Sequence, residues 1–239
     1  MTWSIVAHDP ESGAFAVAVA TRAFAVGAHC PYVRSGVGAV STQSITNRYL
    51  GPAILDLLER GIAPATAIAS ALAADDGRHL RQVHAVDRFG RAAAWTGRHC
   101  VEWCGDRAQD QFSVAGNMLA GEAVLASTVE GFAARHELAL PERLLSAIEA
   151  GEDAGGDRRG RQSAALLLTT TEDFADLNIR VDDHADPLAE LRRLLTIWRE
   201  QWPHRAAWAP SKANPSGCTD LDVIEAAWKQ QGSSLRFRR

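Results

Sequence analysis

The sequence contains little that would tie it to a membrane, to nucleic acid or to a disulfide framework. Four cysteines in 239 residues, at positions 30, 100, 104 and 218, are too few and too scattered for a disulfide scaffold. No apolar run reaches the roughly 18 residues of a transmembrane helix, and His8 and Asp9 come too early for a signal peptide. The net charge of −4 provides no basic excess for a phosphate backbone, although residues 236–239 are locally basic. We therefore expect a cytoplasmic protein with reduced thiols and no nucleic-acid or membrane partner.

Common cofactor and catalytic motifs are missing too. Gly36-Val37-Gly38 lacks the rest of a dinucleotide fingerprint, and no Gly-x-Ser-x-Gly elbow occurs. The eight histidines form no His-x-x-x-His pair, and no repeat recurs along the chain. These absences disfavour Rossmann-type enzymes and α/β-hydrolases, and we expect neither a cofactor nor a metal.

What is present indicates one large globular domain, because 46% of the residues are hydrophobic and 23% are charged. Strands alternate with pairs of helices along the chain, and most strands are joined by short turns. This order favours mainly antiparallel sheets covered by helices, an α+β fold. The expected strands are 3–7, 14–20, 38–42, 82–87, 91–96, 162–169 and 176–181, and the expected helices are 48–60, a segment opened by Pro64, 119–135, 141–150 and 187–202.

The C-terminal part has a different character. Residues 203–217 contain three prolines and several polar residues, which is typical of a linker. Residues 220–231 predict one short helix, which cannot form a domain alone. We thus divide the chain into a main domain (1–202), a linker (203–217) and a short helical tail (218–239), with the tail packed on the body or on a partner subunit.

Thr2 is the first candidate catalytic residue. It directly precedes the apolar strand Trp3-Ser4-Ile5-Val6-Ala7, so removal of Met1 would leave a threonine at the head of the fold. A free N-terminal threonine carries a hydroxyl nucleophile and an α-amine with a pKa of about 7.7 to 8.0, which suits a general base. Threonine is also an ordinary strand former, so the position alone leaves both interpretations open.

Three polar clusters are candidates for the rest of a site. Gln43 lies in Thr42-Gln43-Ser44 at the exit of a strand, with Asn47 close behind. Side chains there are expected to face a cleft, or, for Ser44 and Asn47, to cap the next helix. Asn117 precedes an expected helix, where it would act as an N-cap or help to stabilise an oxyanion. The loop at 155–163 is rich in glycine and arginine and leads into a buried strand, which suits an anionic substrate group. Its arginines could equally pair with nearby acids.

Asp182-Asp183-His184 offers oxygen and imidazole ligands for a divalent metal. However, adjacent residues on an extended chain point in opposite directions, and Asp186 is explained as an N-cap ahead of Pro187. A metal site here is a minor alternative. His99, Cys100 and Cys104 lack the spacing of a structural zinc site.

Several stretches resemble a bacterial domain-of-unknown-function family, numbered 1028. They are Thr2-Trp3-Ser4-Ile5-Val6-Ala7, residues 20–27, Thr42-Gln43, Arg81-Gln82, Gly116-Asn117, residues 154–165 and residues 181–184. The match runs in one order over residues 2 to 200. The resemblance implies an N-terminal-nucleophile (Ntn) hydrolase fold, a four-layer αββα sandwich similar to proteasome subunits, in which the side chain of the freed N-terminal residue attacks an amide carbon.

Two positions depart from the proteasome-like pattern that the resemblance implies. Ala20 stands where those enzymes have an aspartate before Thr21-Arg22, and the cation nearest to their lysine is Arg34. These departures leave room for another substrate, another proton path or no catalysis.

The leading hypothesis is a hydrolase that cleaves an amide or related C–N bond of a small molecule, with a carboxylate on that molecule as one option. Thr2 would attack, and backbone amides or Asn117 would hold the oxyanion. The substrate would be oriented by Arg22 or Arg161, with Gln43, Asp157 and Gln162 as further binding residues. The alternative is a non-catalytic Ntn-fold protein that binds a ligand or partner. A homo-oligomer is left open.

Overall fold

The computed structural model describes residues 2–230 of the chain and contains two antiparallel sheets. The larger has six strands in the order β10-β9-β2-β1-β8-β7. Its members are β1 (Thr2–Asp9), β2 (Ala14–Thr21), β7 (Gly105–Gln109), β8 (Phe112–Asn117), β9 (Ser163–Thr169) and β10 (Leu177–Val181). Strand β1 is therefore an interior strand, paired on one side with β2 and on the other with β8.

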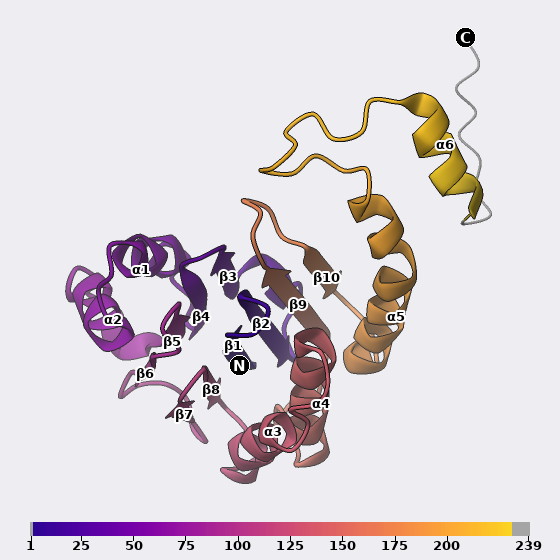
Figure 1. The fold of residues 1–239 in the computed structure, drawn as a ribbon. Coiled ribbons are helices and arrows are strands. Elements are labelled where there is room, and N and C mark those ends of the chain that lie inside the picture. Colours follow the sequence, from indigo (N-terminus) through magenta and orange to yellow (C-terminus); the bar gives the residue numbers. More distant parts are fainter. Residues whose placement is uncertain (1, 231–239) are drawn as a thin grey trace. The chain divides into compact units, whose positions relative to one another are not determined.

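The smaller sheet has the order β3-β4-β5-β6 and packs face to face with the larger. It contains β3 (Pro31–Arg34), β4 (Gly38–Ser44), β5 (Arg81–Asp87) and β6 (Ala92–Thr96). Helices α1 (Leu50–Glu59) and α2 (Pro64–Ala73) cover its outer face, whereas α3 (Ala123–Ala133) and α4 (Leu140–Asp153) cover the outer face of the larger sheet (Figure 1). The expected four-layer αββα sandwich is confirmed.

The turn and helix-end residues identified in the sequence occupy the expected positions. The turn between β1 and β2 places Gly13 at φ 72°, and Gly90 turns the β5–β6 hairpin at φ 77°. Gly61 follows α1 at φ 81° and donates its backbone N–H to Leu58, while Pro64 occupies the first turn of α2. Asp186 caps the helix that begins at Pro187, because its Oδ1 accepts the N–H of Ala189 at 3.2 Å.

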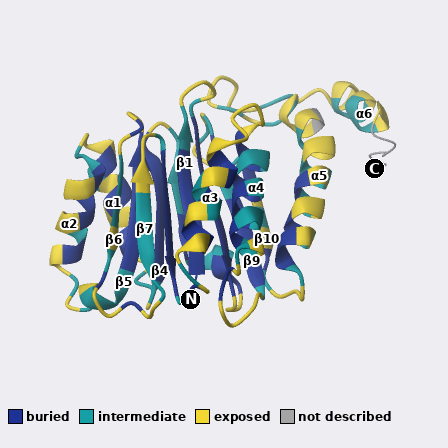
Figure 2. Ribbon diagram, turned by 90° about the horizontal axis from the view of Figure 1, so that it is seen from below, coloured by how far each residue is buried: buried dark blue, intermediate teal, exposed yellow. Residues whose placement is uncertain are grey.

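The layers bury a continuous apolar interior. Strands β1, β2, β8 and β9 are buried along most of their length, and the helices expose only their outward faces (Figure 2). Between the two sheets, Val6, Phe15 and Val17 of the larger sheet pack with Ala39 and Val86 of the smaller one. The strand ends nearer to Thr2 have polar side chains in this interface instead.

Three strands and several boundaries differ from the sequence prediction. Strands β3, β7 and β8 were not expected, and β8 takes Asn117, which was assigned to the start of a helix. Helix α3 begins at Ala123 rather than at 119, with Glu122 as its N-cap residue, so the capping role for Asn117 is wrong. Helix α5 (Pro187–Ala206) contains Pro203, where the linker was expected to begin.

The chain divides into two compact units, residues 1–192 and 193–239, with the division inside α5. The second unit contains the rest of α5 and helix α6 (Leu221–Gln230), which matches the short tail helix expected from the sequence. Within this unit the Trp208 and Trp228 rings lie 6.2 Å apart between centroids, and the N–H of Cys218 donates to the Trp208 carbonyl at 2.9 Å. The expected basic segment 236–239 lies outside the described residues.

Candidate active site

Thr2 lies at the head of β1, in the middle of the larger sheet. It pairs with Asn117 of β8, and the next residue, Trp3, pairs with Ala20 of β2. Only 6% of Thr2 is exposed. The residue whose hydroxyl was expected to act as the nucleophile is thus held by strands on both sides, at the edge of the interior. Met1 lies outside the described residues.

Both polar groups of Thr2 have neighbours from other strands. Its Oγ1 donates to Oγ1 of Thr21, the last residue of β2, at 3.3 Å. Its backbone carbonyl accepts from Nδ2 of Asn117 and from Nε2 of Gln43, each at 3.3 Å. Two of the sequence-predicted residues, Asn117 and Gln43, therefore meet Thr2 directly, and they do so through its main chain.

Three carboxamide side chains form a buried network behind Thr2. Oε1 of Gln82 accepts from both Gln43 Nε2 and Asn117 Nδ2 at 2.9 Å. Nε2 of Gln82 in turn donates to the Gly116 carbonyl at 2.8 Å and to Oγ1 of Thr96 at 2.9 Å. Nδ2 of Asn117 donates to the Thr2 carbonyl and to Oε1 of Gln82, so its two hydrogens are both used. The Asn117 side chain therefore positions Thr2 rather than offering a free donor.

Further inside, Ser4 and His84 join the two sheets. Oγ of Ser4 lies 2.7 Å from Nε2 of His84 and donates to Oε1 of Gln43 at 2.7 Å. Both Ser4 and His84 are fully buried. Burial lowers the pKa of the His84 imidazole to about 3, so this ring is neutral at physiological pH. The pair is closed to solvent and serves to fix Gln43, which holds the Thr2 carbonyl.

The arginine-rich loop reaches the same end of the sheet. Asp157 is buried, and its carboxylate accepts the backbone N–H of Arg22 at 2.8 Å and that of Arg159 at 2.9 Å. The Arg22 guanidinium donates to Oε1 of Gln162 at 2.6 Å. The predicted binding residues Arg22, Asp157 and Gln162 are therefore brought together directly after β2, the strand that ends at Thr21.

Arg161 stands somewhat apart from this group. Its guanidinium lies 3.6 Å from carboxylates of both Glu152 and Asp186. Burial raises the pKa of Glu152, while the charge of Arg161 opposes that shift. Arg159 and Arg161 thus have acidic neighbours, which is the structural role that the sequence also allows, and a substrate role for Arg161 remains a prediction.

The Asp182-Asp183-His184 segment uses its side chains elsewhere. Asp182 pairs with Arg180 at 2.6 Å, Asp183 accepts from Gln162 at 3.0 Å, and Nδ1 of His184 contacts the backbone of Asp186. Among residues 2–230, no three histidine, cysteine or acidic side chains come close enough together to hold a metal ion. The metal alternative has no geometric support in this part of the chain.

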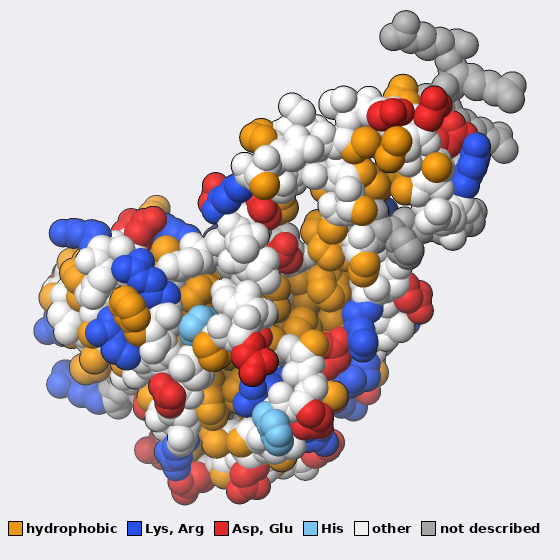
Figure 3. All heavy atoms as spheres, viewed as in Figure 1, with side chains coloured by type: hydrophobic (Ala, Val, Ile, Leu, Met, Phe, Trp, Pro, Cys, Tyr) orange, Lys and Arg blue, Asp and Glu red, His pale blue; other side chains and the backbone are white. Residues whose placement is uncertain are grey.

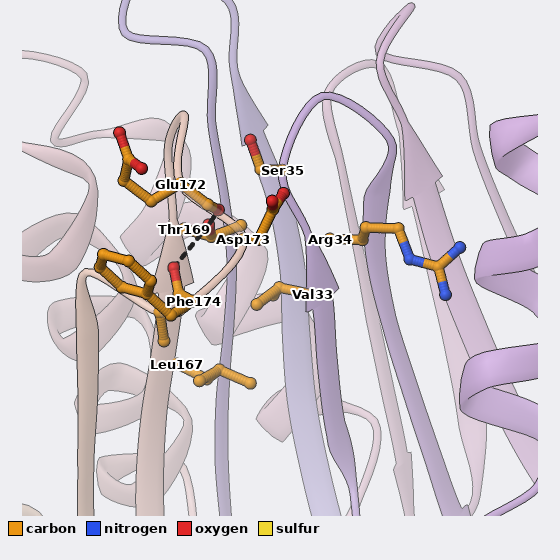
Figure 4. A pocket seen from close by; sticks show the side chains of 9 residues that line it. Val33, Arg34, Ser35, Leu167, Thr169, Glu172, Asp173 and Phe174 are labelled. Atoms are coloured by element: carbon orange, nitrogen blue, oxygen red, sulfur yellow. Dashed lines mark hydrogen bonds between the residues drawn. The ribbon is translucent and has the colours of Figure 1, made fainter. Parts of the chain in front are cut away.

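Arg34 does not reach Thr2. It lies at the far end of the β3–β4 pair, opposite Gly38, and its guanidinium pairs with Asp56 and Glu59 of α1 at 2.8 Å. Figure 4 shows it turned away from a pocket of about 350 Å³ between β3 and β9, whose other side carries Glu172 and Asp173. The sequence has lysines only at positions 212 and 229. The side chains of Thr21, Gln43 and Asn117 that bond Thr2 are neutral, and the sequence of the first unit contains no lysine.

Left-handed backbone conformations gather around the Thr2 end. Ala25, Ser44 and Met118 have φ angles of 55°, 73° and 51°. Ser44 is the last residue of β4. Met118 directly follows Asn117, the last residue of β8, and Ala25 lies shortly after Thr21, the last residue of β2. Side chains other than glycine adopt this region at a cost, and such residues cluster at functional sites.

The chain is similar to one protein family and to several solved structures over most of its length. The model described as "Family of unknown function (DUF1028)" matches residues 2–191. The chain belongs to this family. A DUF1028 protein from Silicibacter pomeroyi has 32% sequence identity and a TM-score of 0.85, over 92% of this chain and 96% of that one. None of the curated proteins matches.

Two further structures are more distant. Anbu (ancestral beta-subunit) from Yersinia bercovieri has 10% identity and a TM-score of 0.36, over 87% of this chain and 98% of that one. An Anbu mutant from a Hyphomicrobium species has 14% identity and a TM-score of 0.41, over 86% and 96% of the two chains.

The surface of this DUF1028 protein shows no field of a single sign on the face drawn in Figure 3, where acidic and basic side chains are interspersed. In the part of the chain that the structure describes, no helix has both the length and the apolar character needed to cross a bilayer.

Sequence reasoning missed four residues of the DUF1028 site: Ser4, Gln82, His84 and Ser41, whose Oγ accepts from Oγ of Ser4 at 3.0 Å. A signal for them exists in the strands. The polar residues of the site stand two positions apart in each strand, as Thr2/Ser4, Ser41/Gln43 and Gln82/His84, although β4 has further polar residues at 42 and 44. Because alternate residues share a face of a strand, this spacing predicts one polar face on each of β1, β4 and β5.

Proposed function

We propose that this DUF1028 protein is a cytoplasmic Ntn hydrolase that cleaves an amide or related C–N bond of a small carboxylated molecule. The observation that carries the proposal is the placement of Thr2 at the head of an interior strand, with its carbonyl held by Asn117 and Gln43. Such a placement fixes a nucleophile before the substrate arrives. The αββα sandwich and the resemblance to Ntn hydrolases support the same assignment.

The chemistry begins once Met1 has been removed. The freed α-amine of Thr2 takes the proton of its own Oγ1, directly or through a water, while Oγ1 forms a bond to the substrate carbonyl carbon. The C–N bond then breaks, and the proton passes to the leaving nitrogen. Water hydrolyses the resulting ester and regenerates the hydroxyl. Backbone amides hold the oxyanion, because both side-chain hydrogens of Asn117 have other acceptors.

The remaining residues have supporting roles in this proposal. Thr21 accepts the hydrogen bond of the Thr2 hydroxyl and so orients it. Arg22 and Arg161 orient the carboxylate of the substrate, and Asp157 and Gln162 fix Arg22 by accepting its backbone N–H and its guanidinium. Gln43 and Asn117 are positioning residues, since they contact the main chain of Thr2.

The test starts with the mass of the intact protein made in bacteria. Loss of Met1 is expected for the wild type and for Thr2→Ala and Thr2→Ser, because each has a small second residue. A β-lactone should then acylate the wild type and Thr2→Ser at residue 2 but leave Thr2→Ala unmodified there. A panel of amino-acid amides, ureides and small peptides would identify the hydrolysed bond. Retention of Met1, or equal labelling of Thr2→Ala, overturns the mechanism.

A second candidate is a non-catalytic binding protein of the same fold. The neutral surroundings of Thr2 favour it, since the sequence has no lysine before position 212 and Ala20 replaces an acid. A thermal-shift screen with small carboxylates separates the two candidates. A binder keeps its ligand-induced stabilisation in Thr2→Ala and shows no turnover in either form, whereas a hydrolase loses turnover in that variant.

A further inference from the structure

A second pocket, outside the proposed active site, lies at the free edge of the smaller sheet. It has a volume of about 480 Å³ and is lined by Asp76, Arg78, His79, Trp95, Thr96 and Arg98. We call it the β6 pocket, because Trp95 and Thr96 belong to that edge strand (Figure 1). Its size falls in the range of small-molecule sites, which is roughly 300–1,000 Å³.

The cations of the β6 pocket are not used by the fold. Among the described residues, the guanidinium groups of Arg78 and Arg98 have no carboxylate partner. Many other arginines of this chain do have one; these are Arg34, Arg81, Arg91, Arg107, Arg159, Arg161, Arg180 and Arg192. Two unpaired guanidinium groups on one pocket form a site for a carboxylate.

Asp75, next to Asp76 in the sequence, is already paired with another arginine, Arg81. The Asp75 carboxylate already accepts from Nε of Arg81 and Nδ2 of Asn47, both at 2.9 Å, and from the backbone N–H of Gly77 at 2.8 Å. The hydrogen bond from Arg81 is the main reason that the pKa of Asp75 is lowered to about 2. Asp76 is thus the one acid that lines the β6 pocket. The lining therefore carries two guanidinium groups and one carboxylate, and the Asp106 carboxylate lies behind it, where it accepts from Oγ1 of Thr96 at 2.6 Å.

Trp95 supplies a flat apolar wall. It is 41% exposed, although most large aromatic side chains of a folded domain bury more of their surface. Its Nε1–H donates to the Arg78 carbonyl at 3.3 Å, which fixes the indole relative to the segment that carries the first guanidinium. The His79 ring packs edge-on against His99, with centroids 4.9 Å apart, and completes the wall. A fixed aromatic face of this kind favours stacking of a planar ring.

We propose that the β6 pocket binds a small planar carboxylate, with its ring against Trp95 and its carboxylate on Arg78 and Arg98. The two guanidinium groups offer the paired donors that a single carboxylate group accepts. Asp76 offers an acceptor for an N–H or O–H group on the same ring. The proposal does not rest on the hydrolase activity, because its binding groups, Trp95, Arg78 and Arg98, lie outside the network behind Thr2, which shares only Thr96 with this pocket.

The Trp95 indole N–H provides a local readout by nuclear magnetic resonance. Its signal is identified by its loss in Trp95→Phe. Titration with benzoate should shift this signal saturably, while acetate, which has no ring, and benzamide, which has no charge, should shift it at least about tenfold less at equal concentration. Equal shifts for all three probes, or no saturable shift with benzoate, overturn the proposal.

Variants assign the binding to the named residues. Replacing both arginines (Arg78→Gln with Arg98→Gln) should weaken benzoate binding by at least about tenfold. Arg88→Gln is the matched control, since Arg88 is an exposed arginine at the other end of the β5–β6 hairpin, and it should leave binding unchanged. Thr2→Ala should also keep benzoate binding, so failure of the hydrolase mechanism and failure of this proposal are separate results. An unchanged affinity in the double variant overturns the assignment.

Discussion

Ser4 and His84 meet in the middle of the sandwich, with Oγ of the serine 2.7 Å from Nε2 of the imidazole. One comes from β1 of the larger sheet and the other from β5 of the smaller, and both are fully buried. This contact is a polar link between the two sheets. Further along the same interface, around Val6 and Val86, the contacts between the sheets are apolar. It fixes the position of one sheet relative to the other next to Thr2.

His84 should make the protein less stable in acid. Its pKa is lowered to about 3 by burial, whereas the unfolded chain has the ordinary value of about 6.5. Between these values the unfolded state binds a proton that the folded state does not, so the free energy of unfolding falls as the pH falls. The limiting slope is about 1.4 kcal/mol per pH unit. Urea unfolding at several pH values between 7 and 4 measures it.

His84→Gln should reduce the slope of the free energy of unfolding against pH by the equivalent of about one bound proton. We expect this variant to be less stable than the wild type at pH 7. His136→Gln is the control, because the side chain of His136 is 82% exposed in the folded protein, and this variant should retain the wild-type slope. If His84→Gln and the wild type lose stability in parallel on acidification, another group is responsible.

Asn117→Ala should destabilise the protein by about 1–3 kcal/mol. The substitution removes the donor to the Thr2 carbonyl and to Oε1 of Gln82, both of which lie in the interior. Unmade hydrogen bonds of buried groups carry their full desolvation cost. Asn178→Ala in β10 is the matched control, since Asn178 is exposed, and its effect should stay within about 0.5 kcal/mol in urea unfolding. Equal effects of the two substitutions would contradict the buried network.

The four cysteines should differ sharply in thiol reactivity. Cys30 is buried, and burial raises the pKa of its thiol to about 12, while Cys100 is buried as well. Cys104 and Cys218 are partly exposed. A chromogenic disulfide reagent at pH 8 should therefore modify at most two thiols of the folded protein rapidly, and all four after denaturation. Cys218→Ser should remove one of the rapid ones. Rapid modification of Cys30 in the folded state would contradict this packing.

Gly51→Ala should destabilise α1 against its sheet. A Cβ at Gly51 would overlap the Tyr32 ring, which cannot move freely because its hydroxyl donates to the His29 carbonyl at 3.2 Å. Overpacking of this kind outweighs the better helix propensity of alanine, and we expect a net loss of about 1–2 kcal/mol in thermal or urea unfolding. Gly121→Ala, where a Cβ meets nothing within 4 Å, should change stability by less than about 0.5 kcal/mol. A neutral Gly51→Ala would show that the Tyr32 ring has room to shift.

The sequence predicts antiparallel sheets covered by helices, because its helices and hairpins carry local signals such as Gly61 after α1 and Pro64 at the start of α2; the four-layer arrangement comes from the family resemblance. The sequence does not reveal β7 and β8, and the reasons are also physical. Gly105–Gln109 is an edge strand without β-branched residues, and its pairing with Phe112–Asn117 depends on a turn in which Gln111 adopts φ 71°. The final Gly116-Asn117 of β8 has the composition of a helix start. Only tertiary contacts make it the end of a strand.

The sequence predicts individual residues of the site but not the contacts between them. Thr2, Gln43 and Asn117 were identified singly, by chain position, strand end and residue type. Their meeting at the Thr2 carbonyl requires that β4 of one sheet faces β1 of the other, which no local pattern specifies. His84 lies 80 residues from its partner Ser4, so its role emerges only when the two sheets stack.

Chain ends usually fray, because the last residue of a strand has few neighbours and gains entropy by detaching. The interior position of β1 reverses this expectation for Thr2, which has a strand on each side and two amides on its carbonyl. Trimming one residue from this protein would therefore create a terminus that is ordered from the start. The conformational entropy of that terminus is lost once, during folding, and need not be lost again in each encounter with a substrate.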